Sequence, residues 1–269
     1  MRVAGEVPKM EVMAWHWIVQ NWLRGLAEEK IRETVARAAR EQMSAGSKAT
    51  EEHESRPCDV GAVFALAEES GGLEDLLEGL VTTKGDGFLV RQGDWKGRRI
   101  AIAVSGAGRK AAARAAESLI LGHRPAWVLS AGFCGGLSPT LHRHDLLVAD
   151  RITLDDGTEM QVDLAALRSA SCLSGKGIHV GRLVTVDQIV RRPREKQALG
   201  ETYDALGVDL ESFAVAEVCA RRQTRFLAVR VVSDAVEERL PREVERLSRH
   251  KTRAAQFGAA VGAFLNRPG

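Results

Sequence analysis

Three acidic side chains placed next to predicted secondary-structure elements carry the main chemical signal of the sequence. Glu69 and Asp234 each follow a short apolar run, and Glu211 begins a helical segment. Ligands of open α/β sheets bind beyond the carboxyl ends of the strands. We therefore expect Glu69, Glu211 and Asp234 to converge on one edge of a sheet. A carboxylate cluster there suits general acid–base chemistry and stabilisation of a developing cation, the two functions needed to cleave a glycosidic bond.

Each of the three acids also has a purely structural interpretation. Glu69 would favour a helix dipole from the first turn of a helix. Asp234 would serve as an N-cap after a strand, and Glu211 would form an ion pair on a helix face. The sequence alone leaves both interpretations open for every one of these residues.

Glycine-rich turns follow two of the predicted strands. Ser105-Gly-Ala-Gly108 comes after the strand predicted at residues 99–104, and Gly132-Phe-Cys-Gly-Gly136 comes after residues 126–131. Glycine lets the backbone approach a flat or polar ligand closely. The first turn is equally compatible with an ordinary strand–helix connection.

Other reactive residue types have weaker patterns. Cys134 lies in the second glycine turn, but no base is near it in the sequence, which favours a small buried thiol over a nucleophile. His142 and His144 have metal-like spacing without a third ligand nearby, which favours a surface turn. Arg109 and Lys110 fit a helix start. The sequence therefore predicts neither a metal site nor a cofactor.

Strand-like and helix-like runs alternate from Cys58 onward. This alternation predicts an α/β fold with a mostly parallel or mixed central sheet flanked by helices. The expected strands are residues 60–66, 88–91, 99–104, 126–131, 146–151, 180–186 and 226–232. The expected helices are residues 73–80, 110–121, 211–221 and 241–265, the last with Pro241 near its start.

The first 57 residues differ from the rest in their pattern of apolar and polar residues. Apolar residues recur at helical spacing over residues 10–43, and residues 44–57 are small, polar and charged, as in a linker. We expect a helical extension plus linker at 1–57 and a catalytic domain at 58–269. The tryptophan-rich helix fits packing or a subunit interface; attachment to a membrane surface is the less favoured alternative, because its charges balance.

Composition excludes several classes of protein. The chain has 269 residues, 45% hydrophobic and 28% charged residues, and a formal net charge of +2. This balance is ordinary for a globular protein and provides no electrostatic case for nucleic-acid binding. Four scattered cysteines, no long apolar run and no signal-peptide pattern lead us to expect reduced thiols and a cytoplasmic protein.

An ordered set of motifs resembles the nucleoside phosphorylase type I superfamily over residues 59–265, and is most similar to the methylthioadenosine/S-adenosylhomocysteine nucleosidases. The motifs are Val60-Gly-Ala-Val-Phe-Ala-Leu-Ala-Glu-Glu69, Ser105-Gly-Ala-Gly-Arg-Lys-Ala-Ala112, Gly132-Phe-Cys-Gly-Gly-Leu-Ser-Pro-Thr-Leu141, Val208-Asp-Leu-Glu-Ser-Phe-Ala-Val215 and Val229-Arg-Val-Val-Ser-Asp-Ala235. The resemblance implies a phosphorylase-like three-layer fold, a small nucleoside as substrate, a role in methionine salvage and a homodimer.

The resemblance also implies roles for the acids. Asp234 protonates N7 of the leaving purine, Glu211 binds the ribose hydroxyls and steadies the cationic sugar, and Glu69 activates the attacking water. To hold its proton near neutral pH, Asp234 needs a raised pKa. The residues implied to bind the substrate are Phe133, Cys134, Gly135, Leu210, Ser233 and Gly106.

Water is favoured over phosphate as the nucleophile. Phosphorolytic relatives carry an arginine on a strand where this chain has Val128-Leu-Ser-Ala-Gly132, and Glu68 and Glu69 occupy the first loop, where phosphate would need cations. Phe133, Leu210 and His144 depart from the nucleosidase pattern. Parts of the chain are also similar to hopanoid-associated nucleoside phosphorylases. An adenosyl-lipid substrate is therefore one alternative, and a non-catalytic nucleoside-binding protein is another.

Overall fold

The computed structural model describes residues 57–84, 88–169, 173 and 175–241. The helix expected at residues 10–43, nearly all of the linker and the helix expected at residues 241–265 lie outside the described residues. The helical extension therefore stays a prediction, as does the division of the chain at residue 57.

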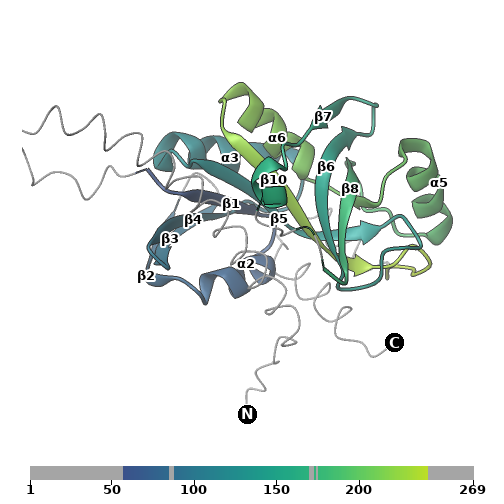
Figure 1. Ribbon diagram of the computed structural model, residues 1–269, viewed down its shortest axis with the longest axis horizontal. Helices are drawn as coiled ribbons and strands as arrows, with labels where there is room; N and C mark the ends of the chain where they lie inside the picture. Colours follow the sequence, from purple (N-terminus) through teal and green to yellow (C-terminus); the bar gives the residue numbers. More distant parts are fainter. Residues whose placement is uncertain (1–56, 85–87, 170–172, 174, 242–269) are drawn as a thin grey trace, which may run out of the picture.

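The described residues form one sheet of ten strands (Figure 1). The strands are β1 (Val60–Phe64), β2 (Glu78–Lys84), β3 (Leu89–Trp95), β4 (Arg98–Val104), β5 (Trp127–Gly136), β6 (Leu146–Leu154), β7 (Glu159–Gln161), β8 (Ile178–Thr185), β9 (Gly207–Asp209) and β10 (Arg225–Asp234). Nine of them follow the order β10-β6-β8-β9-β5-β1-β4-β3-β2, β7 pairs with β6 beside this path, and β10 also pairs with β5. Strands β5, β10, β6, β8 and β9 thus close into a ring from which the remaining sheet extends.

Strand direction determines where the functional side chains gather. Strands β4, β1, β5 and β10 are mutually parallel neighbours, whereas β2, β3 and β6 attach through antiparallel pairings. The predicted mixed α/β fold is therefore confirmed. Because β1, β5 and β10 run in the same direction, the residues that follow them meet at one edge.

Helices cover both faces of the sheet. They are α2 (Ala67–Glu74), α3 (Arg109–His123), α4 (Ala165–Ser169), α5 (Pro193–Tyr203) and α6 (Ser212–Arg221). Helices α3 and α6 pack on one face of the β1–β4–β5 region, where Val63 and Leu119 belong to one apolar cluster. Helix α2 lies on the opposite face, where Phe64 and Leu73 belong to another cluster (Figure 1). Alternate residues of β1 thus point to opposite layers.

The helix expected at residues 73–80 is wrong. Helix α2 begins at Ala67 and ends at Glu74, and strand β2 begins at Glu78. The Glu69 side chain accepts the Leu66 N–H and so starts the helix earlier. Beyond it, Gly79 has a φ of +63°, and the β-branched residues that follow favour a strand.

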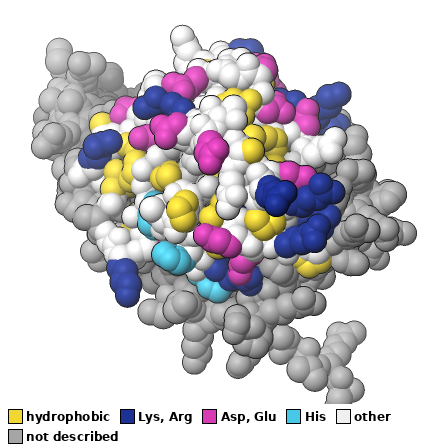
Figure 2. Space-filling model, turned by 90° about the vertical axis from the view of Figure 1, so that its right-hand side faces the viewer, with side chains coloured by type: hydrophobic (Ala, Val, Ile, Leu, Met, Phe, Trp, Pro, Cys, Tyr) yellow, Lys and Arg dark blue, Asp and Glu magenta, His cyan; other side chains and the backbone are white. Residues whose placement is uncertain are grey.

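The state of the cysteines and the distribution of surface charges agree with what the composition predicts. Cys58, Cys134 and Cys219 are buried and free of disulfides, as predicted, whereas Cys172 lies outside the described residues. Acidic and basic side chains are interspersed over the face shown in Figure 2.

Two further findings concern only the part of the chain that the structure describes. No helix there has the length and apolar character needed to cross a bilayer. No group of three or more metal-ligating side chains is arranged there to hold an ion.

Candidate active site

A pocket lies where β1, β5 and β10 end and α6 begins. Its volume is about 720 Å³, part of it open to solvent. Four acidic side chains and a larger number of apolar ones line it. The lining residues are Ala65, Leu66, Glu69, Ala107, Phe133, Cys134, Gly135, Val186, Ile189, Val190, Val208, Asp209, Leu210, Glu211, Ser233, Asp234 and Leu240. Glu69, Glu211 and Asp234 thus share one pocket, as expected from their positions beside the predicted elements.

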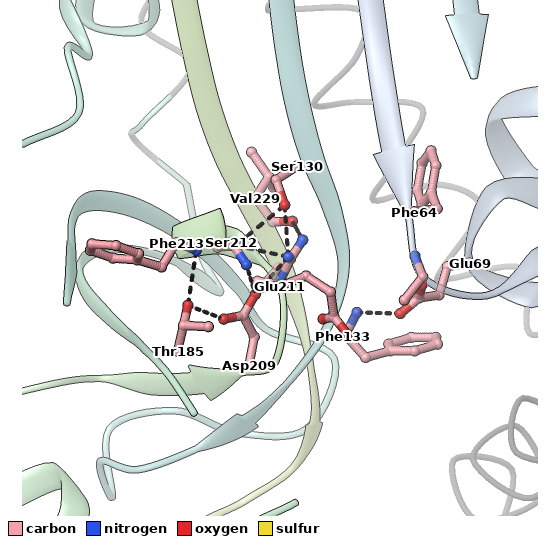
Figure 3. A network of polar contacts seen from close by, with 12 residues as sticks. Phe64, Glu69, Ser130, Phe133, Thr185, Asp209, Glu211, Ser212, Phe213 and Val229 are labelled. Carbon is pink, nitrogen blue, oxygen red and sulfur yellow. Dashed lines mark hydrogen bonds and ion pairs between the residues drawn. The ribbon is translucent and has the colours of Figure 1, made fainter. Parts of the chain in front are cut away.

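Backbone N–H groups from two elements hold the Glu69 carboxyl. Its Oε2 accepts from Ala65 at 3.0 Å and from Leu66 at 2.8 Å. Its Oε1 accepts from the Phe133 N–H at 2.9 Å, the contact drawn in Figure 3. Burial raises the pKa of Glu69, while the Phe133 N–H and the Arg230 charge act in the opposite direction. Both oxygens are therefore fixed in orientation at the end of β1.

Gly132 provides the space that Glu69 occupies. A Cβ at this position would lie 2.6 Å from Glu69 Oε1, and the φ of Gly132 is +150°. Only glycine allows both the close approach and this backbone conformation. The turn predicted at residues 132–136 is wrong, because β5 continues through Gly136. Gly132, inside this strand, leaves room for the Glu69 carboxyl group.

The loop before α3 holds Glu211. The Gly108 N–H donates to Glu211 Oε1 at 2.8 Å, and Gly108 has a φ of +96°. This contact joins two segments 103 residues apart in the chain. The turn Ser105-Gly-Ala-Gly108 is thus a support for an acid of the pocket.

A buried arginine binds one of the four acids, Asp209, below the pocket. Arg230, 2% exposed, projects from β10, and its Nη2 donates to Asp209 Oδ2 at 2.7 Å and to Ser130 and Ser212 Oγ at 2.8 Å. Asp209 also accepts from the Ser212 N–H at 2.9 Å and from Thr185 Oγ1 at 2.7 Å (Figure 3). The Asp209 carboxylate therefore fixes the start of α6, the helix that follows Glu211.

Burial and neighbouring charge make Glu211 easy to protonate. Burial first, and then the charge of Asp209, raises the pKa of Glu211 to about 8, although Arg230 opposes the change. Glu69 acts in the same direction as Asp209. The pocket thus contains a carboxyl group that can exchange a proton near neutral pH.

Asp234 is held by a serine and a lysine. The Ser233 hydroxyl donates to Asp234 Oδ1 at 2.5 Å, and the Lys196 ammonium pairs with Oδ2. Burial raises the pKa of Asp234, while Lys196 and Ser233 lower it. The structure therefore agrees with the raised pKa that an acid in this position requires.

Most of the residues expected to bind a substrate line the pocket. Five of the six line it: Phe133, Cys134, Gly135, Leu210 and Ser233. Gly106 does not, although its neighbour Ala107 does. Burial raises the pKa of the Cys134 thiol, which agrees with an unreactive cysteine.

Other residues considered from the sequence lie away from the lining. Arg109 donates from Nε to Asp187 at 2.7 Å, joining the start of α3 to the segment after β8. The exposed His142 contacts Asp145 at 3.5 Å. Neither Arg109 nor His142 lines the pocket.

Three charged residues of the site were not predicted from the sequence: Arg230, Asp209 and Lys196. An arginine inside an apolar strand was a usable signal for Arg230, because an isolated buried charge needs a partner. Asp209 could have been found in the same way as Glu211, because it precedes Glu211 by two residues and also lies just before the predicted helix. Lys196 lies on α5, a helix that was not predicted.

Comparisons with known proteins agree with the fold. A family profile described as the phosphorylase superfamily matches residues 59–266. A 5′-methylthioadenosine/S-adenosylhomocysteine nucleosidase from Neisseria meningitidis is 23% identical, with a TM-score of 0.62 over 77% of this chain and 97% of that chain. An S-adenosylhomocysteine nucleosidase from Streptococcus pyogenes is 18% identical, with a TM-score of 0.63 over 79% and 98%. A futalosine hydrolase mutant from Helicobacter pylori is 20% identical, with a TM-score of 0.61 over 77% and 96%.

Proposed function

The chain belongs to the phosphorylase superfamily, and we propose that it hydrolyses the N-glycosidic bond of an adenine nucleoside. The observation that carries the proposal is the meeting of three buried acids, Glu69, Glu211 and Asp234, in one largely apolar pocket. Breaking this bond requires a proton for the base, a negative charge beside the sugar and a group to activate water.

The three acids divide these tasks. Asp234 gives its proton to N7 of the purine, which neutralises the leaving group. Glu211 acts in its ionised form, whose share grows as pH rises toward its pKa of about 8. This carboxylate attracts the sugar more strongly as positive charge develops, so it stabilises the transition state more than the substrate. Glu69 takes a proton from the attacking water, and its two fixed oxygens define where that water lies.

The charge of the pocket favours water over phosphate. Among the described residues that line it, four are acidic and none is lysine or arginine. Arg230 lies below the pocket and is engaged by Asp209. A phosphate dianion in this environment would meet repulsion without a compensating cation.

The apolar wall supports an apolar 5′ substituent on the nucleoside. Val186, Ile189, Val190 and Leu240 line the pocket, and burial of thioether or alkyl groups against such side chains is favourable. The same wall disfavours a 5′-phosphate. Two of the structural relatives are named as nucleosidases of 5′-methylthioadenosine or S-adenosylhomocysteine, and we propose these compounds as the first substrates to test.

A nucleoside panel tests the proposal directly. The purified protein is incubated with 5′-methylthioadenosine, S-adenosylhomocysteine, adenosine and inosine, each with and without phosphate, and free base and sugar product are quantified. We expect adenine release that is independent of phosphate and yields the free sugar. Formation of a sugar 1-phosphate would contradict hydrolysis.

The same assay separates the alternatives. Release of base only from a detergent-dispersed adenosyl-lipid would favour the lipid substrate. Thermal stabilisation by nucleosides without any base release would identify a non-catalytic binding protein. Our proposal requires turnover of a water-soluble adenine nucleoside.

We also propose a homodimer, a cytoplasmic location and a role in methionine salvage, on the basis of the family resemblance. Light scattering coupled to gel filtration tests the first of these. The expected mass is twice that of a single 269-residue chain.

A further inference from the structure

Lys196 on α5 is fully buried yet has no part in the chemistry proposed above. Its exposed fraction is 0%, and its ammonium donates to Asp234 Oδ2, to the Ala235 carbonyl at 2.7 Å and to the Glu238 carbonyl at 2.9 Å. A lysine ammonium has three N–H donors. All three are therefore used, and every acceptor lies at the end of β10 or just after it.

The burial of this ion pair needs a functional reason. Removing an ammonium and a carboxylate from water costs several kcal/mol per ion, and apolar side chains of similar volume often stabilise a core equally well. Asp234 lines the pocket, whereas Lys196 lies behind it. Any effect of Lys196 on a ligand is therefore exerted through Asp234.

We propose that Lys196 is a positioning residue for Asp234: it fixes the carboxyl group at the end of β10 and stabilises the carboxylate that remains after Asp234 has given its proton to the base. The inference rests on the proposed function. In the step, the Asp234 O–H bond breaks, an N7–H bond forms, and the electron pair of the C1′–N9 bond passes to the purine. Lys196 keeps its proton throughout.

The surroundings leave Lys196 as the main cationic influence on Asp234. Burial raises the pKa of Asp234, Lys196 lowers it, and the nearby Glu238 charge raises it. The Glu238 carboxylate is itself engaged by Arg143 at 2.8 Å and by the Ala235 N–H at 2.9 Å. The Cys134 thiol, on neighbouring β5, has a pKa raised by burial and adds no charge near neutral pH.

Removal of the lysine charge has two consequences with different signatures. The pKa of Asp234 rises, because burial then acts without an opposing cation. This higher pKa makes Asp234 a weaker acid, so the chemical step also slows. A purely structural lysine would reduce the amount of folded protein without moving the pH at which activity is lost.

The test compares Lys196→Met and Lys196→Gln, which remove the charge, with Lys196→Arg, which retains it. Lys176→Met, at an exposed position before β8, controls for the loss of one positive charge. For each protein, kcat and KM for the nucleoside most rapidly hydrolysed by the wild type are measured from pH 5 to 10. Circular dichroism and thermal unfolding report the folded fraction.

In the neutral variants we expect kcat to fall by ~10²-fold with a similar KM, and the alkaline limb of the kcat profile to move upward by about one pH unit or more. Lys196→Arg returns the limb toward its wild-type position, and Lys176→Met matches the wild type throughout.

Folded neutral variants with an unmoved alkaline limb would overturn the role of Lys196 and leave the proposed hydrolysis standing. Failure of both neutral variants to fold would also overturn it, since the residue would then be structural. Absence of base release by the wild type would overturn both proposals.

Discussion

The acidic side chains of the pocket differ in the groups that hold them. Glu69 accepts three backbone N–H groups, Glu211 accepts one, and Asp234 pairs with a serine and a lysine. Substitutions at the three positions are therefore expected to have different consequences for turnover and stability.

Replacing Asp234 with asparagine is expected to lower kcat by ~10²–10⁴-fold, the usual contribution of a positioned acid. The amide keeps the shape of the side chain and still accepts from Lys196, so the fold is retained. Steady-state kinetics measure the loss, and circular dichroism provides the control. A wild-type rate in Asp234→Asn would exclude this residue as the acid.

Replacing Glu69 with glutamine is expected to slow hydrolysis while nucleoside binding, measured by calorimetry, changes little. It also has a structural cost. Both Glu69 oxygens accept backbone N–H groups, so one of these donors would face the amide NH₂ group and lose its acceptor, at a cost of ~1–3 kcal/mol. Urea unfolding measures this second effect. Unchanged hydrolysis together with reduced stability would indicate that Glu69 only supports the structure.

The raised pKa of Glu211 predicts a dependence of stability on pH. The carboxyl group has a pKa of about 8 in the folded protein and 4.5 as its ordinary value. Between these values the folded chain keeps a proton that the unfolded chain has lost. The free energy of unfolding therefore decreases as pH rises from 4.5 through 8, by ~1.4 kcal/mol for each unit of pKa difference that is realised.

Urea unfolding at pH 5, 7 and 9 checks this prediction. Glu211→Gln retains the hydrogen-bonding size of the side chain without its titration, so its stability is expected to fall less over the same range. An identical slope in the variant and the wild type would assign the pH dependence to other groups.

At the residue scale, the acids of the pocket could be predicted from the sequence, but the charged residues that pair with them could not. Glu69, Glu211 and Asp234 were found because the position next to a strand or helix is visible in one dimension. Lys196 and Arg230 depend on carboxylates 38 and 21 residues away. Their burial is favourable only after those partners are in place, and no local pattern reveals that.

Local geometry connects the elements to the chemistry. Strand β5 brings Gly132 against Glu69, and the end of β9 brings Asp209 against Arg230. In both cases a residue of one element positions a charged side chain that belongs to another element.

Gly132→Ala is expected to abolish most turnover. The added methyl group would lie 2.6 Å from Glu69 Oε1 and would have to displace the carboxyl group, and the φ of +150° strains any other residue. Gly122→Ala is the matched control, because Gly122 lies inside α3 with nothing within 4 Å of its added Cβ. That control is expected to keep full activity and to gain up to ~1 kcal/mol of stability. Equal activity of the two variants would contradict the role of Gly132.

The elements that were predicted are those with a strong apolar pattern. Strands β1, β4, β5 and β10 were predicted because the sheet buries both of their faces, although β5 continues to Gly136 instead of ending at residue 131. Strand β2 was missed because all of its residues are exposed. Helix α5 was missed although Pro193 and Glu195 mark its start, because Lys196 is its only buried residue and gives no apolar stripe.

At the scale of the whole molecule, every strand of the described sheet comes from residues 60–234. A chain that begins at Pro57 is therefore expected to fold and to hydrolyse a water-soluble nucleoside with unchanged kcat/KM. Thermal unfolding and the nucleoside assay compare it with the full chain. Loss of activity on the soluble substrate would show that residues 1–56 belong to the catalytic unit.

The ring of β5, β10, β6, β8 and β9 closes through its last member in chain order, since β10 joins β5 on one side and β6 on the other. A polypeptide interrupted before residue 225 would leave two rows of backbone donors and acceptors without a neighbour, and such rows recruit strands from other molecules. We therefore expect truncated chains that lack β10 to aggregate, and chains that have inserted β10 between β5 and β6 to avoid this.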